Sequence, residues 1–132
     1  MCATIQPYAT AVTTGDVHEI SVTLHSDIII LPPGSNQPNE GKAKGAMMLS
    51  AVASVVADFK VVQLYKADEH SYIVSLAGSI DEIPVQFIDQ VHLDENNLID
   101  HMDIFLRPAS MASILLGKVT EEIKKRTTKT QQ

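Results

Sequence analysis

One aspartate lies among large apolar residues in a stretch that is typical of a β-strand. In VQFIDQVHL, residues 85–93, alternate positions hold Val85, Phe87, Asp89, Val91 and Leu93. Successive side chains of a strand point to opposite faces of a sheet, so these five residues share one face. A carboxyl group on an apolar face loses hydration, which disfavours its charged form and raises its pKa. The spacing therefore predicts an Asp89 whose charged form is disfavoured and which, when neutral, can donate a hydrogen bond.

A second carboxylate, Asp100, is a candidate base. In the next predicted strand, residues 98–107, Asp100 shares a face with Met102. The alternative for Asp100 is a solvated position at the rim of the sheet, and we favour this alternative. His101 and Asp103 share the opposite face, where no further histidine stands at ligand spacing, so the sequence predicts no metal site. No motif implies a cofactor.

Apolar periodicity and turn residues divide the chain into helices and strands. Asp16 and Glu19 form a capping box that opens the second helix, although Ile20, Val22 and Leu24 also fit a strand. The expected helices cover 6–13, 16–24, 42–58 and a closing segment that begins at Pro108. The expected strands cover 27–31, 59–67, 71–80, 84–94 and 98–107.

This element order predicts an α+β fold. Helices massed ahead of a meander of strands favour a cone-shaped, strongly bent antiparallel sheet with helices packed on its concave face. A length of 132 residues suits one domain. We expect that domain to span residues 1–126, followed by a disordered tail over 127–132.

Composition excludes several classes of partner. The formal net charge of −6 argues against binding to a nucleic-acid backbone, which needs clustered Lys and Arg. No apolar run approaches the roughly 20 residues that span a bilayer, so we expect no membrane insertion. The start of the chain lacks the features of a signal peptide, and the single cysteine, Cys2, cannot form an internal disulfide. The expected location is cytoplasmic.

Three stretches together carry a family resemblance. They are QPYATAVTTGDVHEISVTLHSDIIILPPGS (6–35), FIDQVHLDENNLIDHMDIF (87–105) and IFLRPASMASIL (104–115). The first two resemble ketosteroid isomerases and related proteins of the nuclear transport factor 2-like superfamily, and the third resembles SnoaL-like polyketide cyclases. The resemblance covers nearly the whole chain. This fold hosts isomerases, cyclases, hydrolases, dehydratases and non-catalytic modules.

The resemblance implies half of an isomerase site. Tyr8 matches the oxyanion-hole tyrosine of ketosteroid isomerases, and Asp89 matches the neutral aspartic acid beside it. The usual base, an aspartate before the loop proline, is replaced here by Leu31. The base is then Asp100, Tyr72, water or the substrate. The alternative for Asp89 is a residue that only hydrogen-bonds Tyr8, a backbone amide or a buried water.

The resemblance also implies an apolar pocket inside the cone. Its expected ligand-binding residues come from the loop, the long helix and three strands: Leu31, Met47 or Met48, Tyr72, Val74, Leu76, Phe87, Met102, Ile104 and Leu106. Two functions fit this pocket. One is proton transfer or ring closure on a small apolar carbonyl compound, of isomerase, cyclase or lyase type. The other is a non-catalytic module that binds an apolar ligand or serves dimerisation.

The outer face of the predicted sheet is half apolar and half polar. It carries Ile88, Gln90, His92, His101, Asp103, Phe105 and Arg107. Such a face suits a partner sheet better than water, so we expect a homodimer through this surface. The alternative is an ordinary solvated sheet with surface ion pairs that contribute little.

Overall fold

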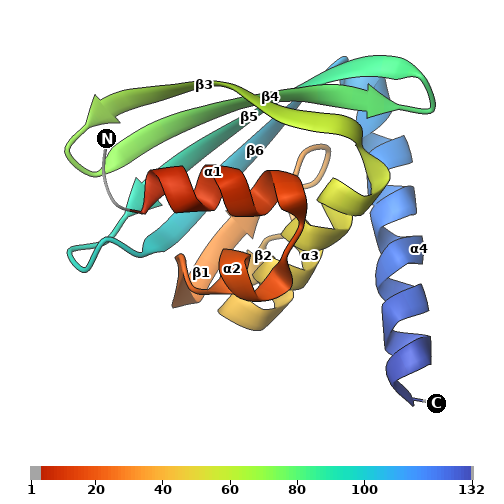
Figure 1. Ribbon diagram of the computed structural model, residues 1–132, viewed down its shortest axis with the longest axis horizontal. Helices are drawn as coiled ribbons and strands as arrows, with labels where there is room; N and C mark the ends of the chain where they lie inside the picture. The colour runs from red at the N-terminus through yellow and green to blue at the C-terminus, as the bar shows by residue number, and fades with distance from the viewer. Residues whose placement is uncertain (1–3, 132) are drawn as a thin grey trace.

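The computed structural model describes residues 4–131, with side chains through residue 128 (Figure 1). Cys2 and Gln132 lie outside the described residues. Helix α1 spans Ile5–Thr14 and ends at Gly15, whose φ of +81° lies in the left-handed region that glycine tolerates. Helix α2 spans Val17–Ser21, and the Asp16 carboxylate accepts a hydrogen bond from the Glu19 amide at 2.9 Å, which confirms the predicted cap.

A curved six-stranded sheet forms the body of the cone, in the order β2-β1-β6-β5-β4-β3. Its strands are β1 (Leu24–Leu31), β2 (Asn39–Glu40), β3 (Ala57–Asp68), β4 (Ser71–Ile80), β5 (Ile83–Leu93) and β6 (Ile99–Arg107). The predicted α+β architecture is confirmed, and Leu24 starts a strand instead of ending a helix. The expectation of a purely antiparallel sheet is wrong, because β1 and β6 run parallel. Alternation along one strand does not reveal the direction of a partner that is distant in the chain.

Helix α3, Lys42–Val55, crosses beneath the sheet beside α1 (Figure 1). It ends three residues earlier than predicted, because the chain turns directly into β3. This turn brings β3 very close to β4 at Gly78. A Cβ atom at Gly78 would lie 2.5 Å from Val56 Cγ1 and 2.7 Å from the Ala57 carbonyl oxygen. Gly78, which lacks a side chain, therefore admits the start of β3.

The chain closes with a short 3-10 turn, Ala109–Met111, and helix α4, Ala112–Gln131. We predict a disordered tail from residue 127, and this stays a prediction; in the structure α4 extends through Gln131. Arg126 ties this end of α4 to α3: its guanidinium donates to Ser50 Oγ at 2.9 Å and to Ser54 Oγ at 2.8 Å. These tertiary contacts support a polar segment that local sequence alone would leave unfolded.

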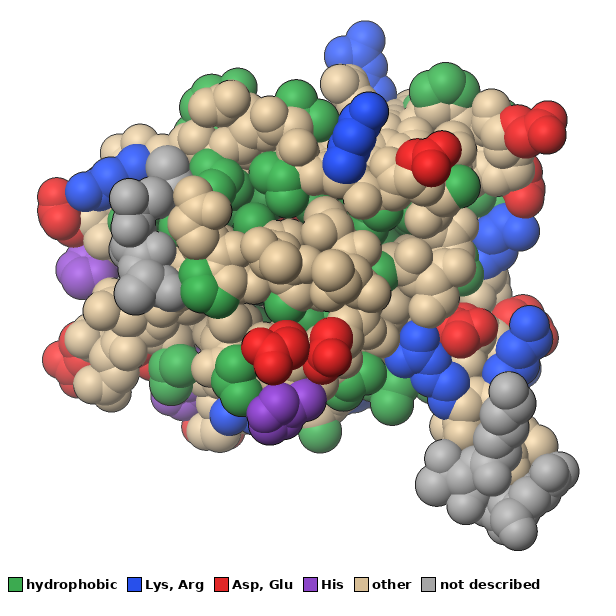
Figure 2. All heavy atoms as spheres, in the orientation of Figure 1, with side chains coloured by type: hydrophobic (Ala, Val, Ile, Leu, Met, Phe, Trp, Pro, Cys, Tyr) green, Lys and Arg blue, Asp and Glu red, His purple; other side chains and the backbone are tan. Residues whose placement is uncertain are grey.

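The hydrophobic core fills the space between the concave face of the sheet and the helices. Its largest fully buried side chains come from α1, α2 and α3 and from strands β1, β4, β5 and β6: Ile5, Tyr8, Ile20, Leu24, Ile28, Ile30, Leu49, Leu76, Ile80, Phe87, Leu93 and Ile99. On the face shown in Figure 2, basic and acidic side chains are interspersed around the rim and along α4. No helix in the described part of the chain is both long and apolar enough to cross a bilayer.

Candidate functional site

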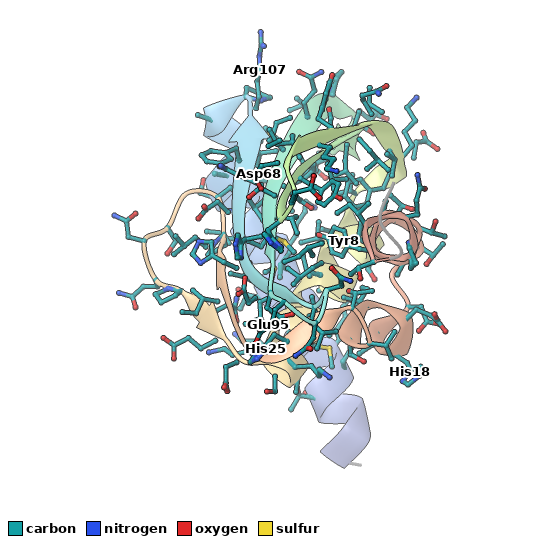
Figure 3. The ribbon with its side chains drawn as sticks, turned by 90° about the vertical axis from the view of Figure 1, so that its left-hand side faces the viewer. Tyr8, His18, His25, Asp68, Glu95 and Arg107 are labelled. Atoms are coloured by element: carbon teal, nitrogen blue, oxygen red, sulfur yellow. The ribbon has the colours of Figure 1, made fainter. Side chains whose placement is uncertain are left out.

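Tyr8 and Asp89 meet in the core. The Tyr8 hydroxyl donates a hydrogen bond to Asp89 Oδ2 at 2.8 Å. Tyr8 is fully buried and Asp89 is only 3% exposed. Tyr8 extends from α1 into the interior, whereas His18 and Arg107 point away from the body (Figure 3). The two residues that the family resemblance singled out therefore form one buried pair.

Simple periodicities bring the pair together. Ile5, Tyr8 and Val12 lie on the buried face of α1, at the spacing of an amphipathic helix. On β5, every second residue from Val85 to Leu93 is buried, which confirms the predicted alternation around Asp89. Strand pairing places Asp89 between Val74 of β4 and Ile104 of β6. Asp89 is thus held at the centre of the concave face by apolar neighbours on both sides.

Burial controls the proton affinity of both members of the pair. Loss of hydration raises the pKa of Asp89 to about 7, and the hydrogen bond from Tyr8 partly opposes this rise. Burial, followed by the nearby Asp89 charge, raises the pKa of Tyr8 well above its ordinary value. Tyr8 is therefore a hydrogen-bond donor at neutral pH, while Asp89 exists in both protonation states. A carboxyl group with this property can take up and release a proton under ordinary conditions.

A narrow apolar cavity adjoins Asp89. It is lined by one residue of α1, two loop prolines and residues of α3, the sheet and α4: Val12, Pro32, Pro33, Met48, Leu49, Val52, Phe59, Phe87, Asp89, Ile104, Leu115, Leu116 and Val119. Asp89 is the one titratable side chain in this wall. The centre of a water molecule can occupy about 20 Å³ inside this cavity, which is room for about one water molecule.

A wider groove lies beside the narrow cavity and is open to solvent. It has a volume of about 520 Å³ and runs between the loop after β1 and the end of β6. Pro32, Pro33 and Ile104 line both the groove and the cavity. These three side chains form the partition between solvent and the space next to Asp89.

The predicted pocket residues divide into three groups. Met48, Phe87 and Ile104 line the cavity beside Asp89. Four others are buried on the inner face of the sheet without lining that cavity: Tyr72, Val74, Leu76 and Met102. Leu31 and Leu106 line the open groove instead. Their role in ligand binding stays a prediction.

The sequence predicts Met47 or Met48 as a pocket residue. Met48 lines the cavity, whereas Met47 does not. The Arg126 guanidinium donates to Met47 Sδ at 3.4 Å, which places Met47 at the contact between α3 and α4. Sequence reasoning also missed the cavity wall supplied by α4. Leu115 and Val119 are recognisable as an apolar helix face, but no sequence signal shows that this face covers the mouth of the cone.

The expectation that Asp100 shares the inner face with Met102 is wrong, and its use as a base stays a prediction that this position does not favour. The pairing of β5 and β6 shifts between His92 and Leu93, which leaves Asp100 as the extra residue of a β-bulge. The bulge turns Asp100 outward, where its Oδ1 lies 2.7 Å from His92 Nδ1. Asp100 therefore occupies the solvated position that we considered as the alternative.

His101 and Asp103 share the outer face as predicted, with His101 Nε2 3.2 Å from Asp103 Oδ1. In the part of the chain that the structure describes, no three His, Cys, Asp or Glu side chains are grouped so that they could hold a metal ion. The buried pair and the cavity beside it remain the best-formed candidate site.

Comparisons with known proteins agree with this architecture. No protein-family model and no curated protein matches the sequence. Among solved structures, an uncharacterised protein with a cystatin-like fold from Silicibacter pomeroyi is similar, with a TM-score of 0.88 and 21% identity over 94% of this chain and 87% of that chain. A steroid delta-isomerase from Pseudomonas aeruginosa has a TM-score of 0.85 and 21% identity over 96% of this chain and 93% of that chain.

More distant similarity extends to a cyclase. The epoxide hydrolase/cyclase-like enzyme SalBIII, which has a role in pyran ring formation in salinomycin, has a TM-score of 0.65 and 21% identity over 80% of this chain and 88% of that chain. At such identities the similarity establishes the fold alone. The chain therefore has the nuclear transport factor 2-like, or cystatin-like, fold that its sequence resembles.

Proposed function

We propose that the protein binds a small apolar carbonyl compound next to Asp89 and catalyses proton transfer at a carbon beside the carbonyl, as an isomerase, cyclase or lyase does. One observation carries this proposal. A carboxyl group with a pKa of about 7 lies on the wall of an apolar cavity, and a phenol hydroxyl lies 2.8 Å from it. The structural likeness to a steroid isomerase and a cyclase-like enzyme supports the same class of reaction.

The two protonation states of Asp89 suit the two parts of such a reaction. Once a proton taken from the ligand has made Asp89 neutral, its O–H and the Tyr8 hydroxyl each donate a hydrogen bond to the enolate oxygen and stabilise it. Ionised Asp89 accepts the proton from the carbon beside the carbonyl, while the bonding electrons move onto the oxygen. The same carboxylic acid then returns that proton to carbon. Because Asp100 lies outside the cavity, Asp89 is the proton acceptor that we assign.

Ligand entry requires a change in the cavity wall. A cavity with room for one water cannot hold an organic molecule unless some of its lining side chains move. Helix α4 contributes Leu115, Leu116 and Val119 to the wall, and Pro32 and Pro33 separate the cavity from the open groove. Displacement of α4 or of this loop opens the space next to Asp89 toward solvent.

Hydrogen–deuterium exchange at carbon tests this function without a known substrate. Small apolar ketones, such as cyclohexanone and acetophenone, are incubated in D₂O with the protein, and loss of the proton signal beside the carbonyl is followed by NMR. The expected result is exchange faster than in buffer, reduced at least tenfold by Asp89→Asn. Exchange at the buffer rate with every ketone, or equal rates for the variant and the wild type, contradicts the proposal.

Ligand binding without turnover is the second candidate function. The observation that favours it is the chemistry of the cavity wall, where the described residues supply a single titratable group instead of a separate acid and base. In that case ketones perturb the NMR signals of the cavity residues in a saturable way, yet no exchange at carbon occurs.

We also propose that two copies associate through the outer face of the sheet. Ser75, Ile88 and Phe105 are cross-strand neighbours in one row of this face, and Phe105 is 54% exposed. The two histidine–aspartate pairs beside this row offer donors and acceptors that a two-fold related copy could match.

A further inference from the structure

Met102 makes a second contact with the Tyr8 hydroxyl. Its Sδ atom lies 3.3 Å from Tyr8 Oη, on the side chain of a β6 residue that is fully buried. Asp89 Oδ2 lies 2.8 Å from the same hydroxyl oxygen. Tyr8 has one proton to donate, whereas two acceptors face it. A thioether sulfur is a weak acceptor, so it cannot compete with a carboxylate for this proton.

The competition changes when Asp89 takes up a proton. The new carboxylic O–H is buried and needs an acceptor, and the Tyr8 oxygen is within reach. If Asp89 donates to that oxygen, the Tyr8 proton must point elsewhere, because it can no longer lie between the two oxygens. The sulfur of Met102 is the acceptor that the structure places at hydrogen-bond distance.

We propose that Met102 is a positioning residue, which accepts the Tyr8 hydroxyl proton when Asp89 is protonated and so allows the hydrogen bond between Tyr8 and Asp89 to reverse. The chain of donors then runs from Asp89 to Tyr8 to Met102. A ligand carbonyl is a stronger acceptor than a thioether, and it displaces the sulfur as the acceptor for Tyr8. This last consequence rests on the proposed function, whereas the hydrogen bond itself does not.

Few other groups can produce the same effect. The pKa of Asp89 is raised by burial and lowered by the hydrogen bond from Tyr8. The neighbours of Asp89 on β4 and β6 are Val74 and Ile104. The residues of α1, α3 and α4 that line the adjacent cavity are apolar and carry no charge. The proton affinity of Asp89 therefore depends on how the Tyr8 hydroxyl is hydrogen-bonded, which makes it a suitable readout for the Tyr8–Met102 contact.

Methionine-to-leucine substitution tests the inference in ligand-free protein. Met102→Leu conserves volume but removes the acceptor, so neutral Asp89 is less stable and its pKa should fall by roughly half a unit. Met48→Leu is the matched control, because Met48 lines the cavity that adjoins Asp89 and makes no contact with Tyr8 that the structure records. The side-chain carboxyl signal of Asp89 is titrated by ¹³C NMR in each protein.

A double-mutant cycle separates the hydrogen bond from packing. In Tyr8→Phe protein no hydroxyl proton needs the sulfur, and Met102→Leu should then leave the pKa of Asp89 unchanged. The inference is overturned if Met102→Leu has no effect in the wild type, or the same effect in both backgrounds.

A measurement on the unaltered protein keeps the inference testable if Met102→Leu does not fold. The ¹³C-methyl signal of Met102 should change with pH at the same midpoint as the Asp89 carboxyl, while that of Met48 should not. A Met102 signal that is independent of pH overturns the inference. Since none of these measurements uses a ligand, the inference and the proposed function can fail separately.

Discussion

Tyr8 and Asp89 are 81 positions apart in the chain, and their side-chain oxygens lie 2.8 Å from each other in the core. The phenol comes from the first helix and the carboxyl from the centre of the sheet. A bond between a hydroxyl and a buried carboxylate is stronger than one between neutral groups. The pair therefore ties α1 to the concave face of the sheet and also supplies the two polar groups on which the proposed chemistry depends.

The first prediction concerns stability against pH. The pKa of Asp89 is about 7 in the folded protein and 3.8 ordinarily, so between these values the folded state binds more protons than the unfolded state. Protonation of Asp89 therefore stabilises the folded state. This contribution to the free energy of unfolding is complete below pH 3.8 and is lost as the pH rises toward 7, by an amount on the order of 4 kcal/mol. Chemical denaturation of wild type and Asp89→Asn between pH 4.5 and 8 measures this difference.

Asp89→Asn is the control for all other titrating groups in that experiment. Asp68 and Asp94 accept backbone hydrogen bonds that lower their pKa values below 3.8, so their pH dependence has the opposite sign and lies below the pH range of this experiment. The difference between the free energies of unfolding of the two proteins at each pH gives the contribution of Asp89. A constant difference over the whole range would show that Asp89 titrates normally.

The second prediction concerns the donor of the pair. Tyr8→Phe removes the hydrogen bond that stabilises the Asp89 carboxylate, so the pKa of Asp89 should rise above 7. Above the new pKa, the free energy of unfolding should fall by about 1.5–3 kcal/mol, the usual contribution of a hydrogen bond to a charged group. Tyr65→Phe is the matched control, because Tyr65 is 52% exposed on β3. Equal stability and equal Asp89 titration in the two variants would contradict the prediction.

The third prediction compares the roles of the two candidate carboxylates, Asp89 and Asp100. Asp100 faces outward beside His92, so Asp100→Asn should change neither the Asp89 titration nor any ketone exchange beyond twofold. Its effect on the free energy of unfolding should stay below about 1 kcal/mol, as for exposed ion pairs. Measurement of exchange in Asp100→Asn and Asp89→Asn in parallel checks this. A large loss of exchange in Asp100→Asn would mean that the bulge does not hold in solution.

The fourth prediction concerns the outer face of the sheet. Phe105→Glu places a charge in the row formed with Ser75 and Ile88, so it should weaken the proposed dimer at least tenfold. Val22→Glu is the control, since Val22 is equally exposed at 51% but lies between α2 and β1. Sedimentation equilibrium measures the dissociation constant. A wild type that remains a monomer at high concentration, or equal weakening by both variants, argues against this interface.

Local patterns sufficed for most of the architecture. The capping box at Asp16 and the alternation of β5 are each specified within one turn or one strand, and the structure confirms them. The burial of Asp89 follows from the same alternation, because a strand with four apolar neighbours on one face must bury the fifth position as well.

Tertiary contacts decided the rest. Alternation predicts which side chains share a face only while the pairing stays regular, and the bulge at Asp100 depends on how β6 fits against β5. The parallel pairing of β1 with β6, the helical end of α4 and the cover of the cavity by Leu115 and Val119 all depend on segments that are far apart in the chain. The sequence alone determined that a carboxyl group is buried on an apolar face. The family resemblance placed Tyr8 beside this carboxyl group, but only the packed structure determined that Met102 contacts the Tyr8 hydroxyl, because contacts between distant segments leave no local pattern.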